Sequence, residues 1–170
     1  MPIDFFEYAE NVNPVEQFGL IDPDDKDGKK PVEISYDDSQ KWNANVICNN
    51  REDYLFVPID NNSDISITRL NEQNKQESDN RCDAMLGTEK TVCFIELKNE
   101  REQWLSHAIK QLESTIELFG DNIKKYKFKK AYACNLNHPN SSALYSNAQS
   151  SFYKKHKIVL RTKTEVSELE

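Results

Sequence analysis

Glycine is scarce in this chain, which has only 4 among its 170 residues. A loop that cradles phosphate groups on its backbone amides needs closely spaced glycines, so the scarcity disfavours an NTPase. The sequence also lacks a Gly-x-Ser-x-Gly segment and the Cys–His pairing of acyl-transfer enzymes. A run of about 18 apolar residues is missing too, so no membrane-spanning helix is predicted.

Cysteine patterns typical of metal-binding or disulfide-rich proteins are also missing. The four cysteines, at positions 48, 82, 93 and 134, include no Cys-x-x-Cys pair and have no histidine at zinc-finger spacing. Three of them lie in apolar runs, so we expect buried free thiols rather than disulfides or a metal site. Free thiols indicate a reducing compartment, and the acidic N-terminal segment does not resemble a secretory signal. We therefore expect a cytoplasmic protein.

The chain has an excess of negative charge, with 29 acidic against 22 basic residues. The resulting net charge of −7 argues against nucleic-acid binding, but the charge is unevenly distributed. Residues 1–80 hold 18 acidic and 7 basic residues, whereas residues 81–170 hold 11 acidic and 15 basic ones. We expect the lysine runs in the second half either to bind along the phosphate backbone of a nucleic acid or to form a solvated surface. These lysines are Lys124, Lys125, Lys127, Lys129, Lys130, Lys154, Lys155 and Lys157.

A length of 170 residues is close to the commonest size of one domain, so we expect a single domain over 1–170. Short apolar runs predict strands, whereas apolar residues at helical spacing, followed by Gly120, predict a long helix. The expected strands span 43–48, 53–59, 81–86, 91–97, 129–134 and 157–162, and the expected helices span 4–10, 101–119 and 141–155. Their order predicts an α/β protein of the α+β kind, with a single mixed central sheet, an antiparallel hairpin core and flanking helices.

The connections follow from turn composition. Residues 49–52 and 87–90 are typical of tight turns, so we expect a hairpin around each. Residues 22–31 are rich in Asp, Gly and Pro but lack the spacing of a calcium loop, which favours a solvated loop. Residues 61–80 are polar and predict a long connection.

The most informative segment is Phe-Ile-Glu-Leu-Lys-Asn, residues 94–99. Side chains alternate across a strand, so Glu96 and Lys98 point to one face while Ile95 and Leu97 point into the core. An ionised Glu and Lys at the end of an apolar strand are costly to bury unless they have a function. The pair is therefore a candidate for a reactive site.

Asp83 lies across the second hairpin, where the turn brings it opposite Ile95 and beside Glu96. Two carboxylates and an ammonium then converge, an arrangement that suits a hard divalent cation with several waters. Such an ion polarises a phosphate and lowers the pKa of a bound water, which Lys98 would orient. The alternative is an ordinary exposed salt bridge, either Asp83–Lys98 or Glu96–Lys98.

The order of Asp83 and then Glu96-Leu97-Lys98 resembles the PD-(D/E)XK nuclease superfamily, which includes restriction endonucleases, RecB-like nucleases and Holliday-junction resolvases. The resemblance implies a restriction endonuclease-like fold and a small bacterial-type member. It also implies that Asp83, Glu96 and the backbone carbonyl of Leu97 bind magnesium or manganese, and that Lys98 is catalytic. Cys82 stands where the name of the superfamily has proline.

The extent of the resemblance is uneven along the chain. It covers 81–135 well, within an expected nuclease-like core over 81–170. It covers the N-terminal half poorly, where we expect an acidic helix and strand region over 1–80. The superfamily often adds an acid from an N-terminal helix, and Glu7 or Glu10 would supply it here.

The helix expected after Lys98 carries a second partial match. RecB-like members have a QLxxY-like motif there, and this chain has Gln111-Leu112 without the aromatic residue. Gln103, His107 and Gln111 follow one another at a spacing of four residues, which predicts a polar stripe on one face. His107 either contacts substrate or is an ordinary surface residue.

These features predict a magnesium-dependent or manganese-dependent nuclease that acts on DNA rather than RNA, as an endonuclease or an exonuclease. The alternative is a catalytically inert module that keeps the fold for binding or immunity, because the acidic first half would repel a duplex. The uneven charge also allows a homodimer with head-to-tail contacts, or a place in a larger defence or repair system.

Overall fold

The computed structural model describes residues 2–23, 30–65, 80–138 and 145–167 with their side chains, and residues 68–70 and 76–78 as backbone. In this part of the chain there are two α-helices, two 3₁₀-helices and three sheets, so the expected α+β class is confirmed. None of the described helices is long and apolar enough to cross a membrane.

The largest sheet, called sheet A here, has six strands. In order across the sheet they are β1 (Glu10–Asn11), β5 (Leu55–Pro58), β8 (Ala84–Gly87), β9 (Thr91–Lys98), β10 (Phe128–Asn135) and β11 (Val159–Arg161). The first four pair antiparallel, whereas β9, β10 and β11 are parallel to one another. The change of direction occurs where a helix connects β9 to β10, as a parallel pair requires.

A second sheet, called sheet B, has four strands from opposite ends of the chain. In order they are β12 (Glu165–Val166), β4 (Ala44–Ile47), β2 (Gln17–Ile21) and β3 (Glu33–Ser35). Strands β6 (Thr68–Leu70) and β7 (Gln76–Ser78) form a separate two-stranded hairpin. The expectation of a single sheet was therefore wrong, because β2 and β4 belong to a second sheet whose apolar side chains pack against sheet A.

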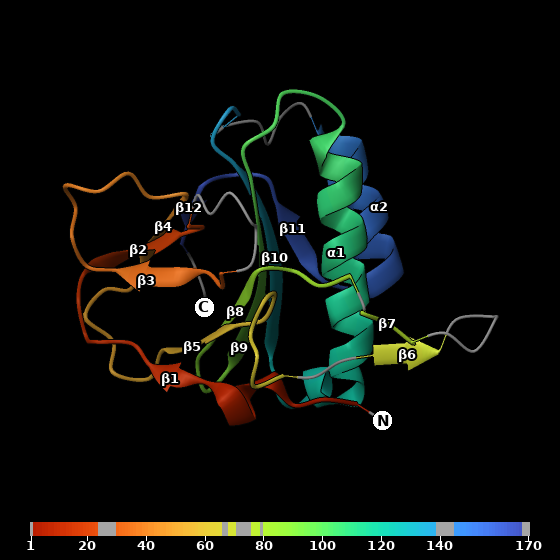
Figure 1. Cartoon of the computed structure of the whole chain (residues 1–170), viewed down its shortest axis with the longest axis horizontal. Helices are drawn as coiled ribbons and strands as arrows, with labels where there is room; N and C mark the ends of the chain where they lie inside the picture. The colour runs from red at the N-terminus through yellow and green to blue at the C-terminus, as the bar shows by residue number, and fades with distance from the viewer. Residues whose placement is uncertain are drawn as a thin grey trace.

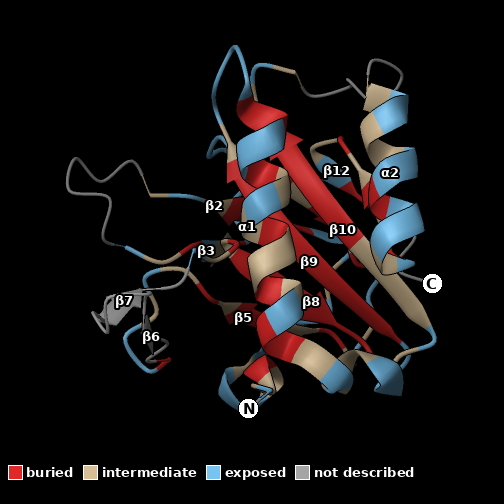
Figure 2. Ribbon diagram, turned by 90° about the vertical axis from the view of Figure 1, so that its right-hand side faces the viewer, coloured by how far each residue is buried: buried red, intermediate tan, exposed pale blue. Residues whose placement is uncertain are grey.

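The helices and the two larger sheets form three layers. Sheet A lies in the middle, with sheet B on one side and the helices α1 (Trp104–Phe119) and α2 (Ser146–His156) on the other (Figure 1). Viewed from the helix side, α1 and α2 lie in front of the buried central strands (Figure 2). The 3₁₀-helices are η1 (Phe5–Tyr8) and η2 (Gly120–Lys125).

The helix α1 forms because apolar residues recur at helical spacing and place Ala108 and Leu112 against sheet A. It ends at Gly120, whose positive φ of 57° suits a residue without a side chain. The amide of Gly120 donates to the carbonyl of Ile116, which satisfies one of the free carbonyls of the last turn. The expected helix and its end are confirmed.

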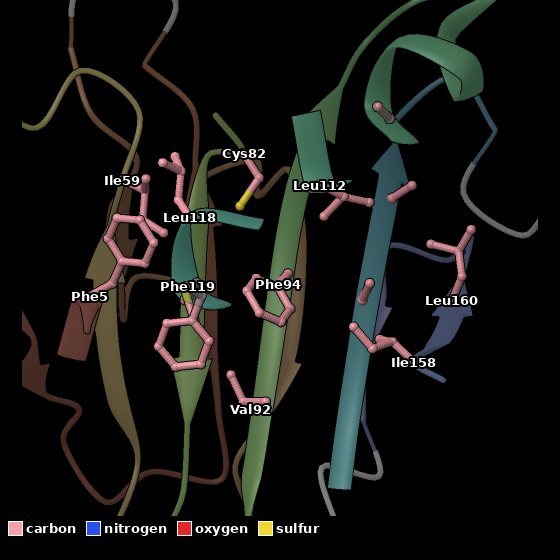
Figure 3. Packing of buried hydrophobic residues seen from close by; sticks show 14 of the residues in the cluster. Phe5, Ile59, Cys82, Val92, Phe94, Leu112, Leu118, Phe119, Ile158 and Leu160 are labelled. Atoms are coloured by element: carbon pink, nitrogen blue, oxygen red, sulfur yellow. The ribbon is translucent and has the colours of Figure 1, made fainter. Parts of the chain in front are cut away.

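Apolar residues are buried on both faces of sheet A. On the helix side, Phe94 of β9 meets Phe119 of α1 edge to face, with ring centroids 5.8 Å apart (Figure 3). On the other side, Ile95 and Leu97 pack with residues of sheet B such as Phe18. The alternation predicted for β9 is therefore confirmed, and both faces of this strand are core.

One expected hairpin is wrong. The strands predicted over 43–48 and 53–59 exist as β4 and β5, but they belong to different sheets. Asn49 and Asn50 both have positive φ, and their amides donate to the carbonyls of Glu16 and Val15 instead of forming a hairpin ladder. The turn thus directs the chain from sheet B to sheet A.

Other predicted elements are confirmed with small shifts of their boundaries, and some lie partly outside the described residues. Strands β10 and β11 match the predictions over 129–134 and 157–162, and the N-terminal helix is a short 3₁₀-helix. The long connection predicted over 61–80 contains the hairpin of β6 and β7. Residues 24–29 of the predicted loop and residues 141–144 of the predicted second helix lie outside the described residues.

Candidate functional site

The candidate site lies where β8 begins and β9 ends. Ala84 pairs with Ile95, so Asp83, one residue earlier, comes opposite Glu96. The amide of Asp83 donates to Glu96 Oε2 over 3.1 Å, and the amide of Leu97 donates to Asp83 Oδ2 over 2.7 Å. Two hydrogen bonds thus connect Asp83, just before β8, to Glu96 and Leu97 at the end of β9.

Lys98 completes the group from the same face of β9. Its Nζ lies 3.2 Å from Glu96 Oε1, and the side chains of Lys98 and Glu96 are 15% and 2% exposed. The three residues Asp83, Glu96 and Lys98 therefore lie together, as the sequence predicted. The ion pair is buried rather than exposed, so the alternative of an ordinary surface salt bridge does not describe it.

Burial dominates the electrostatics of the two carboxyl groups. It raises the pKa of Asp83 to about 7, and the nearby charges of Asp22 and Asp60 act in the same direction, although the Leu97 amide and Lys98 oppose them. Burial also raises the pKa of Glu96 well above its ordinary value, and the charge of Asp83 adds to this. Neutralising one carboxylate, or adding a cation, would relieve this repulsion.

An open cleft of about 560 Å³ adjoins the site, and of the three predicted catalytic residues Asp83 is the one that lines it. Its other walls come partly from loops beside sheet B, including Asp22, Lys30 and Lys41, and partly from Asp60 after β5. Sequence reasoning missed these residues because sheet B was not predicted. The one available signal was that Asp60 directly follows a predicted strand.

Helix α1 holds the segment before Asp83 in place. The amide of Gln111 donates from Nε2 to the carbonyl of Arg81 over 3.3 Å. The hydroxyl of the buried Thr115, one turn later, accepts from the amide of Cys82 over 2.8 Å. Gln111 therefore lies close to the site, as predicted, but it bonds to the backbone of the strand and supports Asp83 indirectly.

Two other residues predicted on this helix lie further out. Gln103 immediately precedes α1 with a positive φ of 53°, and His107 lies in its first turn. Both side chains are exposed. They share a stripe with Gln111, but neither lines the cleft beside Asp83.

Glu7 and Glu10, the candidates for an additional acid from the N-terminal helix, lie away from the site. Glu7 belongs to η1, next to Phe6, whose ring lies against Gly87 at the far end of β8. Glu10 belongs to β1 and lines a neighbouring groove. Asp60 and Asp22 are instead the acids whose charges act on Asp83.

The potential metal ligands form a small set. The described residues contain no group of three or more His, Cys, Asp or Glu side chains that could hold a metal ion. Asp83 and Glu96 remain as two adjacent carboxylates, and the side chain of Leu97 points into the core, so only its backbone is available. This set leaves room for waters and for oxygens of a substrate.

All four cysteines are buried and unpaired, as expected. Burial raises the pKa of Cys82 and of Cys134, and the charges of Asp83 and Glu96 act in the same direction. Both thiols therefore stay protonated, so neither is a ready nucleophile.

The lysines predicted to bind nucleic acid do not gather at this site. In the parallel pair of β9 and β10, Lys129 lies beside Val92 and Lys130 beside Cys93, five or six residues from Lys98. A strand rises about 3.3 Å per residue, so they lie about 16–20 Å from Lys98 along the sheet. The remaining lysines of the runs are Lys124 and Lys125 in η2, Lys127 beside it, Lys154 and Lys155 in the last turn of α2, and Lys157 at the C-terminal cap of α2.

Several of these lysines have partners inside the protein. Lys125 pairs with Asp4 at 3.1 Å, and Lys124 pairs with Asp121 at 2.9 Å. Lys155 pairs with Glu113 of α1, which also contacts His156. The pairs of Lys125 and Lys155 connect η2 to the N-terminal segment and α2 to α1, whereas the pair of Lys124 lies within η2.

No family model matches the chain, and no curated protein or solved structure does so either.

Proposed function

We propose that the protein is a divalent-metal-dependent phosphodiesterase, a nuclease of the PD-(D/E)XK type, with DNA favoured over RNA as the substrate. The observation that carries this proposal is the pair of hydrogen bonds between Asp83 and the end of β9. They hold the half-buried carboxylate of Asp83 and the buried carboxylate of Glu96 next to the ammonium of Lys98, in the arrangement that the resemblance implies. A restriction endonuclease-like fold is part of the same proposal.

Asp83 and Glu96 are the residues that would hold magnesium or manganese. Mg²⁺ is usually bound through one or two carboxylates, several waters and substrate phosphates, so a set of two carboxylates suits it. A neighbouring dication would favour the ionised forms of both groups, whose pKa values burial raises in the metal-free protein. When bound, the ion would polarise a phosphate and lower the pKa of a water.

Lys98 would act on the phosphate or on the attacking water. An ammonium has three N–H donors, and the contact with Glu96 uses one of them. The remaining donors can stabilise negative charge that develops on phosphate oxygens in the transition state. Glu96 restrains the ammonium, and the Leu97 amide restrains Asp83, so both groups are held before substrate arrives.

The test compares wild type with Lys98→Ala on mixed DNA and RNA substrates in magnesium or manganese. We expect wild type to cleave DNA, chelation to abolish cleavage, and Lys98→Ala to lower the rate about 10²–10³-fold. Lys90→Ala is the matched control, because Lys90 is exposed in the turn at the other end of the same hairpin. Equal activity in wild type and Lys98→Ala, or no activity in either on any substrate, would refute the proposal.

A second candidate function is a binding or immunity module without turnover. The near-complete burial of Glu96, which is 1% exposed, and the acidic first half of the chain favour it. Calorimetric titration with Mg²⁺ separates the two functions: a nuclease should bind the ion and lose binding on Asp83→Asn. An inert module should bind no ion in either form.

The four buried free thiols support a cytoplasmic location for either function.

A further inference from the structure

Two lysines line the cleft beside Asp83, and neither belongs to the lysine runs of the second half. Lys30 lies just before β3 and Lys41 just before β4, so both come from the loops of sheet B. Both side chains are exposed. The layered packing of the two sheets therefore places cationic groups from the acidic half of the chain beside an acid of sheet A.

These two ammonium groups are available to an external partner. Within the described ranges, no ion pair involves Lys30 or Lys41. By contrast, Lys124 and Lys125 at the far end have acidic partners. An anionic ligand can therefore engage Lys30 and Lys41 without breaking an existing ion pair.

Apart from Asp22, Asp60 and Asp83, the described residues that line the rest of the cleft offer uncharged polar side chains and no aromatic platform for bases. Amide side chains of Asn43, Asn61 and Asn99 line it, and among its described lining residues none is aromatic. Proteins that hold single strands through their bases use aromatic side chains as stacking platforms. Lysine and asparagine instead contact phosphate and sugar oxygens, which carry no sequence information directly.

The geometry points to Lys30 and Lys41 as the phosphate-binding residues of a nucleic-acid substrate, which the cleft holds by its backbone with its scissile phosphate near Asp83. This assignment rests on the proposed function and specifies how the substrate is bound. It replaces the lysine runs around η2 and β10, of which Lys129 and Lys130 lie about 16–20 Å from Lys98 along the sheet. Binding through phosphates alone should depend weakly on base sequence and strongly on salt.

The experiment measures binding of a fluorescein-labelled DNA duplex of mixed sequence in the Lys98→Ala background, so that the DNA stays intact. Lys30→Ala and Lys41→Ala are each titrated in Mg²⁺ across about 50–200 mM salt. Lys41→Arg retains the positive charge, and Lys124→Ala is the matched control at the far end. In parallel, the single-lysine variants with Lys98 intact are assayed for cleavage.

Each alanine variant of the cleft should weaken binding about three- to ten-fold and reduce the slope of log affinity against log salt by about 0.9. Lys41→Arg and Lys124→Ala should bind like the parent, and the cleavage assay should show a raised KM with kcat unchanged. If the cleft variants bind and cleave like their parents while wild type cleaves, the inference fails and the proposed function stands. A protein that neither binds nor cleaves DNA would overturn both.

Discussion

At the scale of single residues, the site could be predicted where its geometry is local. Strand alternation places Glu96 and Lys98 on one face, and the hairpin brings Asp83 to them. The predicted register was one residue off, because Ala84 rather than Asp83 pairs with Ile95. The small shift leaves Asp83 directly opposite Glu96, where the two hydrogen bonds form.

Residues that reach the site from distant segments could not be predicted. Asp60 and Lys41 arrive because two sheets pack together, and no local pattern records that packing. Thr115 is a clearer case, since it lies on the buried face of α1 and its partner Cys82 is 33 residues away. A threonine in an apolar helix face signals a buried hydrogen bond but does not identify the partner.

We predict that Thr115→Val destabilises the protein by about 1–3 kcal/mol, because it leaves the buried Cys82 amide without an acceptor. Valine has nearly the same shape, so the loss is that of the hydrogen bond. Urea unfolding gives the free energy of unfolding of each form. Thr115→Ser keeps the hydroxyl and is the control, so equal stability of the Val and Ser variants would contradict this prediction.

At the scale of helices and strands, the sequence predicts elements that have a clear hydrophobic periodicity and pack against elements close in sequence. The hairpin of β8 and β9, the helix α1 and the strand β10 all follow from local pattern. Strands β2, β3 and β12 were missed; β3 and β12 are short, and β12 pairs with β4 from the opposite end of the chain. The false hairpin around Asn49 and Asn50 has the same cause: a turn fixes the local direction of the chain but not the sheet that the next strand joins.

The strand β12 gives a prediction at this scale. Val166 is fully buried, and β12 pairs in parallel with β4, while the amide of Asn45 donates to the carbonyl of Thr164. Val166→Ala should cost about 1–3 kcal/mol and speed hydrogen exchange at Asn45. The control Glu165→Ala, at an exposed position of the same strand, should stay within about 0.5 kcal/mol of wild type. Unchanged exchange at Asn45 in Val166→Ala would show that β12 does not stabilise sheet B.

At the scale of the whole molecule, the boundary between the acidic and basic halves does not divide the sheets. Sheet A takes β1 and β5 from the first half, and sheet B takes β12 from the end of the chain. Because of this exchange, the acids at 22 and 60 lie near Asp83 and act on its pKa. The acidic and basic halves of the sequence are therefore not separate regions of the structure. Acids and lysines from both halves lie around Asp83.

This concentration of acids predicts how the stability of the metal-free protein depends on pH. The pKa of Asp83 is about 7 in the folded chain and near 3.9 in an unfolded one, so between these values the folded chain holds a proton that the unfolded chain has released. The free energy of unfolding should consequently be highest near the lower value and fall as pH rises towards 7. The raised pKa of Glu96 acts in the same direction.

Asp83→Asn isolates this effect, because asparagine keeps an acceptor for the Leu97 amide and cannot ionise. From pH 5 to pH 8 the free energy of unfolding of wild type, measured by urea titration in chelator, should fall by about 1–3 kcal/mol more than that of Asp83→Asn. At pH 8, Mg²⁺ should restore stability to wild type alone, because an ion that binds only the folded state stabilises it. Identical pH profiles for the two proteins would show that the Asp83 carboxyl ionises as easily in the folded chain as in water. In that case burial and the neighbouring charges of Asp22 and Asp60 would not be what favours a cation at this site.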